Sequence, residues 1–180
     1  MSKTQTIRQL SYAAICITLA LVLSQIRLFT MPQGGEVTAC SMLFIVLVGY
    51  WFGPKTGITA GLAYGILRLF LGAYIIHPVQ LGLDYLLPSA ALGAFGFLKS
   101  QKWGLHFAYL MGAACVFLGS LISGIVFFSS YAPEGRHVVL YSAIYNLSYI
   151  LPEVAITLVL ISLPQVRGAI EHISLRVGKA

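Results

Sequence analysis

The chain has 180 residues, of which 58% are hydrophobic and only 9% charged, and its mean hydropathy is +0.88. Soluble domains carry about 25% charged residues, so this composition excludes an ordinary soluble domain and indicates an integral membrane protein. The net charge is +6, but the basic residues lie at the ends of apolar segments, which indicates contact with a lipid bilayer and no nucleic-acid partner.

Six apolar segments follow one another, each close to the roughly 20 residues that cross a bilayer as a helix. They cover residues 10–26, 37–52, 57–76, 79–98, 105–128 and 138–163. The first has a basic flank but no small-residue cleavage site before Arg27, so it is not predicted to be a signal peptide. The sequence therefore predicts an all-α fold: one membrane domain, residues 1–180, built as a six-transmembrane-helix bundle.

The charges predict that both termini are cytoplasmic in a multi-pass protein of the plasma membrane. On this topology the inner side holds Lys3, Arg8, Lys55, Lys99, Lys102, Arg167, Arg176 and Lys179. The outer loops hold only Arg27 and Arg136, and such a bias sets orientation. The acids on the outer side are Glu36, Asp84, Glu134 and Glu153. An electronegative outer mouth favours a cationic solute.

In the first segment, Ala14 and Thr18 are four residues apart and form a small uncharged patch. Small residues at this spacing let another helix approach closely. The patch packs either inside the protein or against a partner, and the spacing alone leaves both open.

In the third segment, Gly57, Gly61 and Gly65 recur every four residues, with Gly72 one heptad further. This stripe predicts close packing against another helix.

Arg68 lies three residues after Gly65, so it is expected on the same packed face and pointing into the protein. Asp84 and Glu153 are its candidate partners inside the membrane. The leading interpretation is a structural ion pair between Arg68 and Glu153, which leaves Asp84 free for a ligand. Contact between Arg68 and the ligand is the alternative.

Asp84 is an acid in an otherwise apolar run, where an unpaired carboxylate costs several kcal/mol. Gln80 lies one turn before it on the same face, and Asn146, Tyr149 and Glu153 form a second polar stripe. Interhelical hydrogen bonds alone would explain an isolated polar residue. Two polar stripes and an acid at matching depth favour a solute cavity.

Enzyme chemistry is not predicted. The sequence has no Walker A motif, no G-x-S-x-G and no H-E-x-x-H. Cys16, Cys40 and Cys115 have neither metal-ligand nor C-x-x-C spacing, so no metal site, disulfide or cofactor is expected.

Three segments together carry a family resemblance: Met-Pro-Gln-Gly-Gly at 31–35, residues 77–85 with His-Pro-Val-Gln and Leu-Asp-Tyr, and residues 131–146. In their order and spacing the chain resembles the thiamine-specific substrate-binding (S) components of energy-coupling factor transporters, the ThiT/YuaJ family. The resemblance implies a six-helix protein that binds thiamine, as transported ligand, near its outer face. It also implies partners: a transmembrane coupling subunit and two cytoplasmic ATPases.

The resemblance implies roles for individual residues. Asp84 matches the acidic ligand contact, Tyr141 and Asn146 match the pyrimidine-recognition positions, and Phe128 matches an aromatic stacking position. Tyr74 and Tyr85 match wall positions, and Gly34 and Gly35 belong to a loop that acts as a lid. Gln80, on the same helix face as Asp84, is a further candidate ligand contact. Ala14 and Thr18 match the small-residue motif that docks the coupling subunit.

Ser120 departs from the family, which usually has a ligand-contacting His before the Ile-Ser-Gly stretch at 122–124. A serine can neither stack nor carry charge. An S component for another vitamin or a thiamine precursor is therefore an alternative. A further alternative is an ion-coupled secondary transporter in which Asp84 or Glu153 carries the proton.

Overall fold

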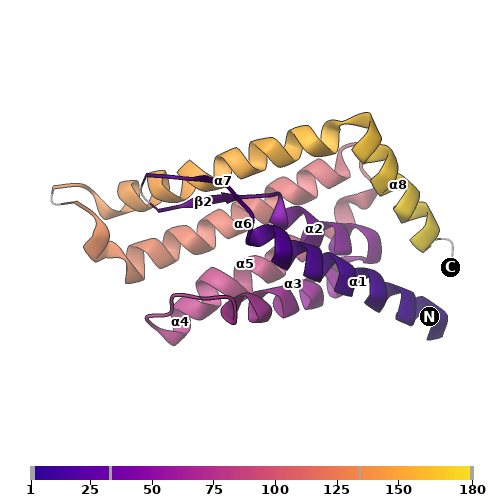
Figure 1. The fold of residues 1–180 in the computed structure, drawn as a ribbon, viewed down its shortest axis with the longest axis horizontal. Helices are drawn as coiled ribbons and strands as arrows, with labels where there is room; N and C mark the ends of the chain where they lie inside the picture. Colours follow the sequence, from indigo (N-terminus) through magenta and orange to yellow (C-terminus); the bar gives the residue numbers. More distant parts are fainter. Residues whose placement is uncertain (1–2, 33, 134, 179–180) are drawn as a thin grey trace.

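The structure is a computed structural model and describes residues 3–32, 34–133 and 135–178. It is an elongated bundle whose longest helices run along the long axis (Figure 1). The helices are α1 (Lys3–Ser24), α2 (Ser41–Phe52), α3 (Pro54–Leu69), α4 (Pro78–Leu81), η1 (Gly82–Leu86), α5 (Leu87–Ala94), η2 (Phe95–Ser100), α6 (Gly104–Phe127), η3 (Ser129–Tyr131), α7 (Val138–Ser162) and α8 (Pro164–Gly178). Strands β1 (Arg27–Thr30) and β2 (Glu36–Thr38) pair antiparallel as a hairpin.

Within the described residues, 4 helical stretches are long and apolar enough to cross a membrane: Gln5–Ser24, Pro78–Ser100, Gly104–Phe127 and Val138–Ser162. They coincide with four of the predicted spans. The first helix begins, and the last helix ends, at the same end of the bundle (Figure 1). The total of six spans and the cytoplasmic position of both termini stay predictions.

Helix α2 forms the buried centre of the bundle. It packs against α1, α3, α5 and α6, and its residues Ile45, Val46 and Val48 have almost no exposed surface. Its sequence is apolar on nearly every face, as expected of a helix that is surrounded by others.

The glycine stripe of α3 packs against η1 and α5, so the predicted close helix contact is confirmed. A Cβ atom at Gly57, Gly61 or Gly65 would collide with backbone atoms of Gly93, Ser89 or Tyr85, respectively. This contact holds the end of α3 directly against the turn that contains Asp84.

The predicted helix 57–76 extends beyond the observed C-terminal end of α3. Helix α3 ends at Leu69, and Gly72 adopts a positive φ of 101° in the turn that follows, so it is not part of the packed stripe. The chain re-enters a helix at Pro78, where His77 is in the extended conformation expected before proline and accepts the N–H of Val79. Residues 70–77 are thus a loop.

The segment between α1 and α2 is a hairpin that apolar patterning did not predict. Strand β2 occupies the start of the expected helix 37–52, which begins only at Ser41. An ion pair across the hairpin joins Arg27 Nε and Glu36 Oε2 at 3.0 Å. At the other end of the chain, α8 is a further helix beyond the last predicted span.

Candidate functional site

Asp84 lies in η1, a wide π-helical turn between α4 and α5. Pro88 has no N–H to donate to the Asp84 carbonyl, so the regular helical bond is impossible there. In the wide turn the N–H of Leu87 bonds to the Gly82 carbonyl instead. Turns of this kind are frequent at functional sites.

The Asp84 carboxylate is held by two side chains at one oxygen. Gln80 Nε2 donates to Oδ2 at 3.0 Å, and Ser123 Oγ donates to the same atom at 2.9 Å. Gln80 is itself fixed, since it accepts the N–H of Ile76 and donates to the Tyr74 carbonyl. Among the residues that the structure describes, Oδ1 has no hydrogen-bond partner. The carboxylate is therefore oriented and keeps one oxygen available for a ligand.

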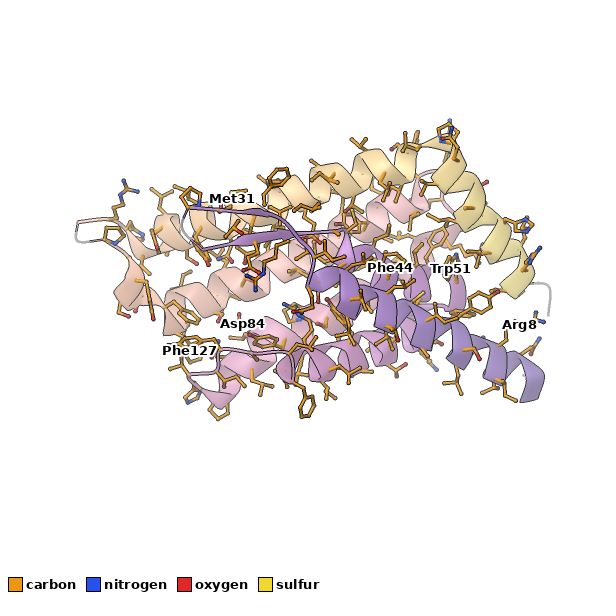
Figure 2. All side chains as sticks on the ribbon, viewed as in Figure 1. Arg8, Met31, Phe44, Trp51, Asp84 and Phe127 are labelled. Carbon is orange, nitrogen blue, oxygen red and sulfur yellow. The ribbon has the colours of Figure 1, made fainter. Side chains whose placement is uncertain are left out.

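Asp84 lines a cavity of about 440 Å³, which is within the usual range of small-molecule sites. Figure 2 shows Asp84 in the half of the molecule that also holds Met31 and Phe127, away from Arg8 near the chain ends. The wall is formed by Arg68, Tyr74, Asp84, Tyr85, Ser120, Ser123, Gly124, Phe128, Tyr131, Tyr141, Ser142, Tyr145, Asn146 and Tyr149.

Aromatic rings form much of this wall. The ring centres of Tyr74 and Phe128 are 6.3 Å apart, and those of Phe128 and Tyr131 are 5.9 Å apart. On α7, Tyr145 and Tyr149 meet edge to face at 5.7 Å. Each ring face can attract a cation by about 0.5–2 kcal/mol.

Asn146 supplies the fixed amide of the wall. It is buried, donates to the Ser142 carbonyl at 2.9 Å, and its Oδ1 accepts the hydroxyl of Tyr149 at 2.6 Å. It also lies 3.4 Å from the carbonyl of Ser120. The amide is thus held by its own helix and by α6, and it keeps a set orientation without a ligand.

A second cavity, of about 540 Å³, adjoins the first and shares with it Arg68, Tyr74, Tyr85, Tyr145 and Tyr149. The hairpin forms part of its wall through Gly34, Gly35 and Glu36. A Cβ atom at Gly35 would collide with the ring of Tyr149, so the hairpin lies directly on α7. The two cavities therefore lie side by side at the five residues that they share.

The expected ion pair between Arg68 and Glu153 is not formed. Glu153 Oε2 accepts the N–H of Thr38 at 3.1 Å and its hydroxyl at 2.9 Å. The Arg68 guanidinium lies instead 5.7 Å from the ring centre of Tyr64 and 5.4 Å from that of Tyr85. The prediction that both residues lie inside the protein is confirmed, but the Glu153 carboxylate accepts hydrogen bonds from the hairpin and not from Arg68.

The family model described as "Thiamine transporter protein (Thia_YuaJ)" matches residues 10–170. The chain is also 34% identical to the "Thiamine transporter ThiT" of Bacillus subtilis (strain 168), over 91% of this chain and 93% of that protein. The chain belongs to this thiamine transporter family. Membership together with the long apolar helices makes it a multi-pass protein of the plasma membrane.

Two further members of the family are similar. The "Thiamine transporter ThiT" of Lacticaseibacillus paracasei is 31% identical over 57% of this chain and 59% of its own length. A solved structure of ThiT from Listeria monocytogenes superposes with a TM-score of 0.70, covering 89% of this chain and 97% of that one. Its sequence identity is 24%, so this likeness supports the fold alone.

Most residues that the sequence predicted for ligand contact line the first cavity: Asp84, Tyr85, Tyr141, Asn146, Phe128, Tyr74 and Ser120. Gly34 and Gly35 line the second cavity, and Gln80 lies behind the wall, where it orients Asp84. Their contact with a ligand stays a prediction. Gln33, in the first family motif, and Glu134, expected in an outer loop, lie outside the described residues.

Sequence reasoning did not select Tyr131, Ser142 and Tyr145 as wall residues. A signal was present on α7, where Tyr141, Tyr145 and Tyr149 recur every four residues and so share one face. Tyr131 lies in the short η3 turn, which no periodicity indicates.

The small-residue patch on α1 is on the outside of the bundle. Ala14 and Thr18 are exposed, whereas Ala13, Cys16 and Ala20 face the core. The Thr18 hydroxyl donates to the Ala14 carbonyl within its own helix at 3.0 Å. Internal packing of this patch is therefore excluded, and a lipid or partner contact is left.

Proposed function

We propose that the chain is the substrate-binding membrane subunit, or S component, of an ATP-driven thiamine importer. The observation that carries this proposal is the oriented Asp84 carboxylate, with one oxygen available, in an aromatic cavity. Thiamine combines a permanently cationic thiazolium with an aminopyrimidine. A desolvated carboxylate suits the cation or the exocyclic amine, and aromatic faces suit the cationic ring.

The remaining wall residues are assigned by chemistry. Tyr141 and Asn146 read the donor and acceptor edge of the pyrimidine, and Phe128 stacks on a ring. Tyr74 and Tyr85 add aromatic wall. Gly34 and Gly35 let the hairpin lie close over the ligand, as a lid. Ser120 contributes only a small polar contact in place of an imidazole.

Binding is expected to be separate from energy use. The chain carries no Walker A motif, so ATP hydrolysis belongs to two cytoplasmic ATPases joined through a transmembrane coupling subunit. In this proposal the chain is a six-span domain with cytoplasmic termini, uses no cofactor and is not an enzyme.

The exposed Ala14 and Thr18 patch is the proposed docking point for the coupling subunit. Enlarging it with Ala14→Leu and Thr18→Leu should abolish thiamine uptake in cells that contain the coupling proteins, while the purified variant still binds thiamine. Ile15→Leu, on an exposed neighbouring position, is the matched control and should leave uptake unchanged. Uptake at the normal rate by the double variant would contradict this docking point.

The binding proposal is tested by calorimetry on protein purified without thiamine. A competition series of thiamine, hydroxymethylpyrimidine and other vitamins identifies the preferred ligand. Related compounds are included because Ser120 stands where the family usually has a ligand-contacting histidine. Failure to bind thiamine or its close analogues would refute the proposal. Uptake by this chain alone in proteoliposomes, driven by a pH gradient without ATP, would support an ion-coupled transporter instead.

A further inference from the structure

Arg68 lies where the two cavities meet. It is in the last turn of α3, one turn after Gly65, whose contact with the Tyr85 backbone holds α3 against η1. Its guanidinium lies near the faces of Tyr64 and Tyr85. Arg68 lines both cavities, so it is part of the site and does not face lipid.

The acids around the site are already engaged by other groups. Glu36 pairs with Arg27, Glu153 accepts from Thr38, and Asp84 accepts from Gln80 and Ser123 at Oδ2. Among the residues that the structure describes, no carboxylate lies within ion-pair distance of Arg68. Two tyrosine faces stabilise a guanidinium by a few kcal/mol at most. The Arg68 guanidinium therefore forms no direct ion pair, although the Asp84 carboxylate lines the same cavity.

This arrangement has a consequence for the ligand. A ligand that carries only positive charge is attracted by Asp84 and repelled by Arg68, since both side chains line the same cavity. A ligand with a cationic ring and an anionic tail satisfies both. The guanidinium fork matches a phosphate group with two parallel hydrogen bonds, and the adjoining 540 Å³ cavity leaves room for it.

We propose that Arg68 binds a phosphate ester carried by the same ligand whose cationic part meets Asp84, so that this chain selects thiamine phosphates over thiamine. The inference rests on the proposed function, because it assumes that the ligand is a thiamine compound. It assigns to Arg68 a specificity-determining role that a structural ion pair with Glu153 would have excluded.

The test is calorimetry of thiamine, thiamine monophosphate and thiamine pyrophosphate against the wild type, Arg68→Gln and Arg68→Lys. The wild type should bind the phosphates more tightly than thiamine. Arg68→Gln should weaken phosphate binding about tenfold or more, the size of one charge-assisted hydrogen bond. The same variant should bind unphosphorylated thiamine at least as well as the wild type, because a repulsive charge has been removed. Arg68→Lys should keep part of the preference.

The opposite signs for the two ligands separate this role from a structural one. An equal loss for thiamine and its phosphates would overturn the proposal, since it would mean that Arg68 only supports the fold. Binding of thiamine without any preference for phosphates in the wild type would also overturn it and leave the proposed function intact. Binding of no thiamine compound at all would refute both.

Two controls complete the experiment. Arg167→Gln makes the same change in charge on α8, where Arg167 pairs with Glu171. This variant should keep the preference for thiamine phosphates. Loss of the preference would show that it depends on the net charge of the protein, and would overturn the proposal. Inorganic pyrophosphate is the second control, because a free anion has the same chemistry. If pyrophosphate binds to the thiamine-loaded protein as tightly as thiamine pyrophosphate binds to the free protein, the anion site serves a separate ligand. The proposal that Arg68 binds a phosphate ester of the same ligand would then be refuted.

Discussion

At the scale of single residues, the charge of Asp84 should decide the affinity for a cationic ligand. Asp84→Asn keeps the size of the side chain and the oxygen that accepts from Gln80 and Ser123, but removes the charge. Loss of one member of a desolvated charge pair costs a few kcal/mol, so thiamine affinity should fall about 100-fold. Calorimetry on the purified variant measures the change.

Ser123→Ala is the matched control for that prediction. It removes one hydrogen bond to the same carboxylate and keeps the charge, so the expected loss is about tenfold or less. If Asp84→Asn binds thiamine as well as Ser123→Ala does, orientation and not charge governs the site.

Individual residues also show what the sequence could predict. Gln80 was placed beside Asp84 by helical spacing, and the structure confirms this contact because both residues are on one continuous helix. The partner of Arg68 was not predictable, because it depends on how far the hairpin reaches over α7. The apolar pattern did not indicate that the N–H and the hydroxyl of Thr38 would donate to the Glu153 carboxylate.

At the scale of elements, Glu153 should hold the base of the hairpin on α7. It is 5% exposed and accepts both the N–H and the hydroxyl of Thr38 at the end of β2. Glu153→Ala leaves these donors without an acceptor in a buried place, at a cost of about 1–3 kcal/mol. Hydrogen exchange of the amides in residues 27–38 should become faster, and thiamine should dissociate about tenfold faster.

Glu171→Ala is the control for the hairpin, because it truncates an exposed glutamate on α8. It should change neither hairpin exchange nor thiamine dissociation. Unchanged hydrogen exchange in Glu153→Ala would show that the hairpin is held by other contacts, such as Gly35 on Tyr149.

The elements differ in how well apolar patterning located them. Long apolar helices such as α6 and α7 were found almost to the residue, because their length and hydropathy are set by the bilayer. The hairpin was missed because its strands have only four and three residues, which is too short to show a pattern. The end of α3 was missed because residues 70–76 are still apolar, and the positive φ at Gly72 leaves no trace in hydropathy.

At the scale of the whole molecule, the two ends of the bundle differ in charge and in the position of the cavity. The end with the first and last helices carries Arg8 and Arg176, whereas the cavity lies toward the opposite half, with Asp84 (Figures 1 and 2). A basic end on the cytoplasmic side agrees with the positive-inside rule. The cavity would then open toward the outside, where an importer captures its ligand.

Cysteine labelling can test this orientation directly. Cys16, Cys40 and Cys115 are replaced by alanine, and His137→Cys or His172→Cys is then introduced singly, since both positions are exposed. Position 137 precedes α7 at the cavity end, and position 172 lies in α8 near the chain ends. In intact cells a membrane-impermeant maleimide should label His137→Cys and not His172→Cys, whereas both should react after permeabilisation. The reverse pattern would place the termini outside, and the cavity could then not receive a ligand from the medium. Labelling of both variants in intact cells would place positions 137 and 172 on the same side of the membrane. An even number of crossings would then separate them instead of the single crossing by α7, and the six-span topology would be refuted.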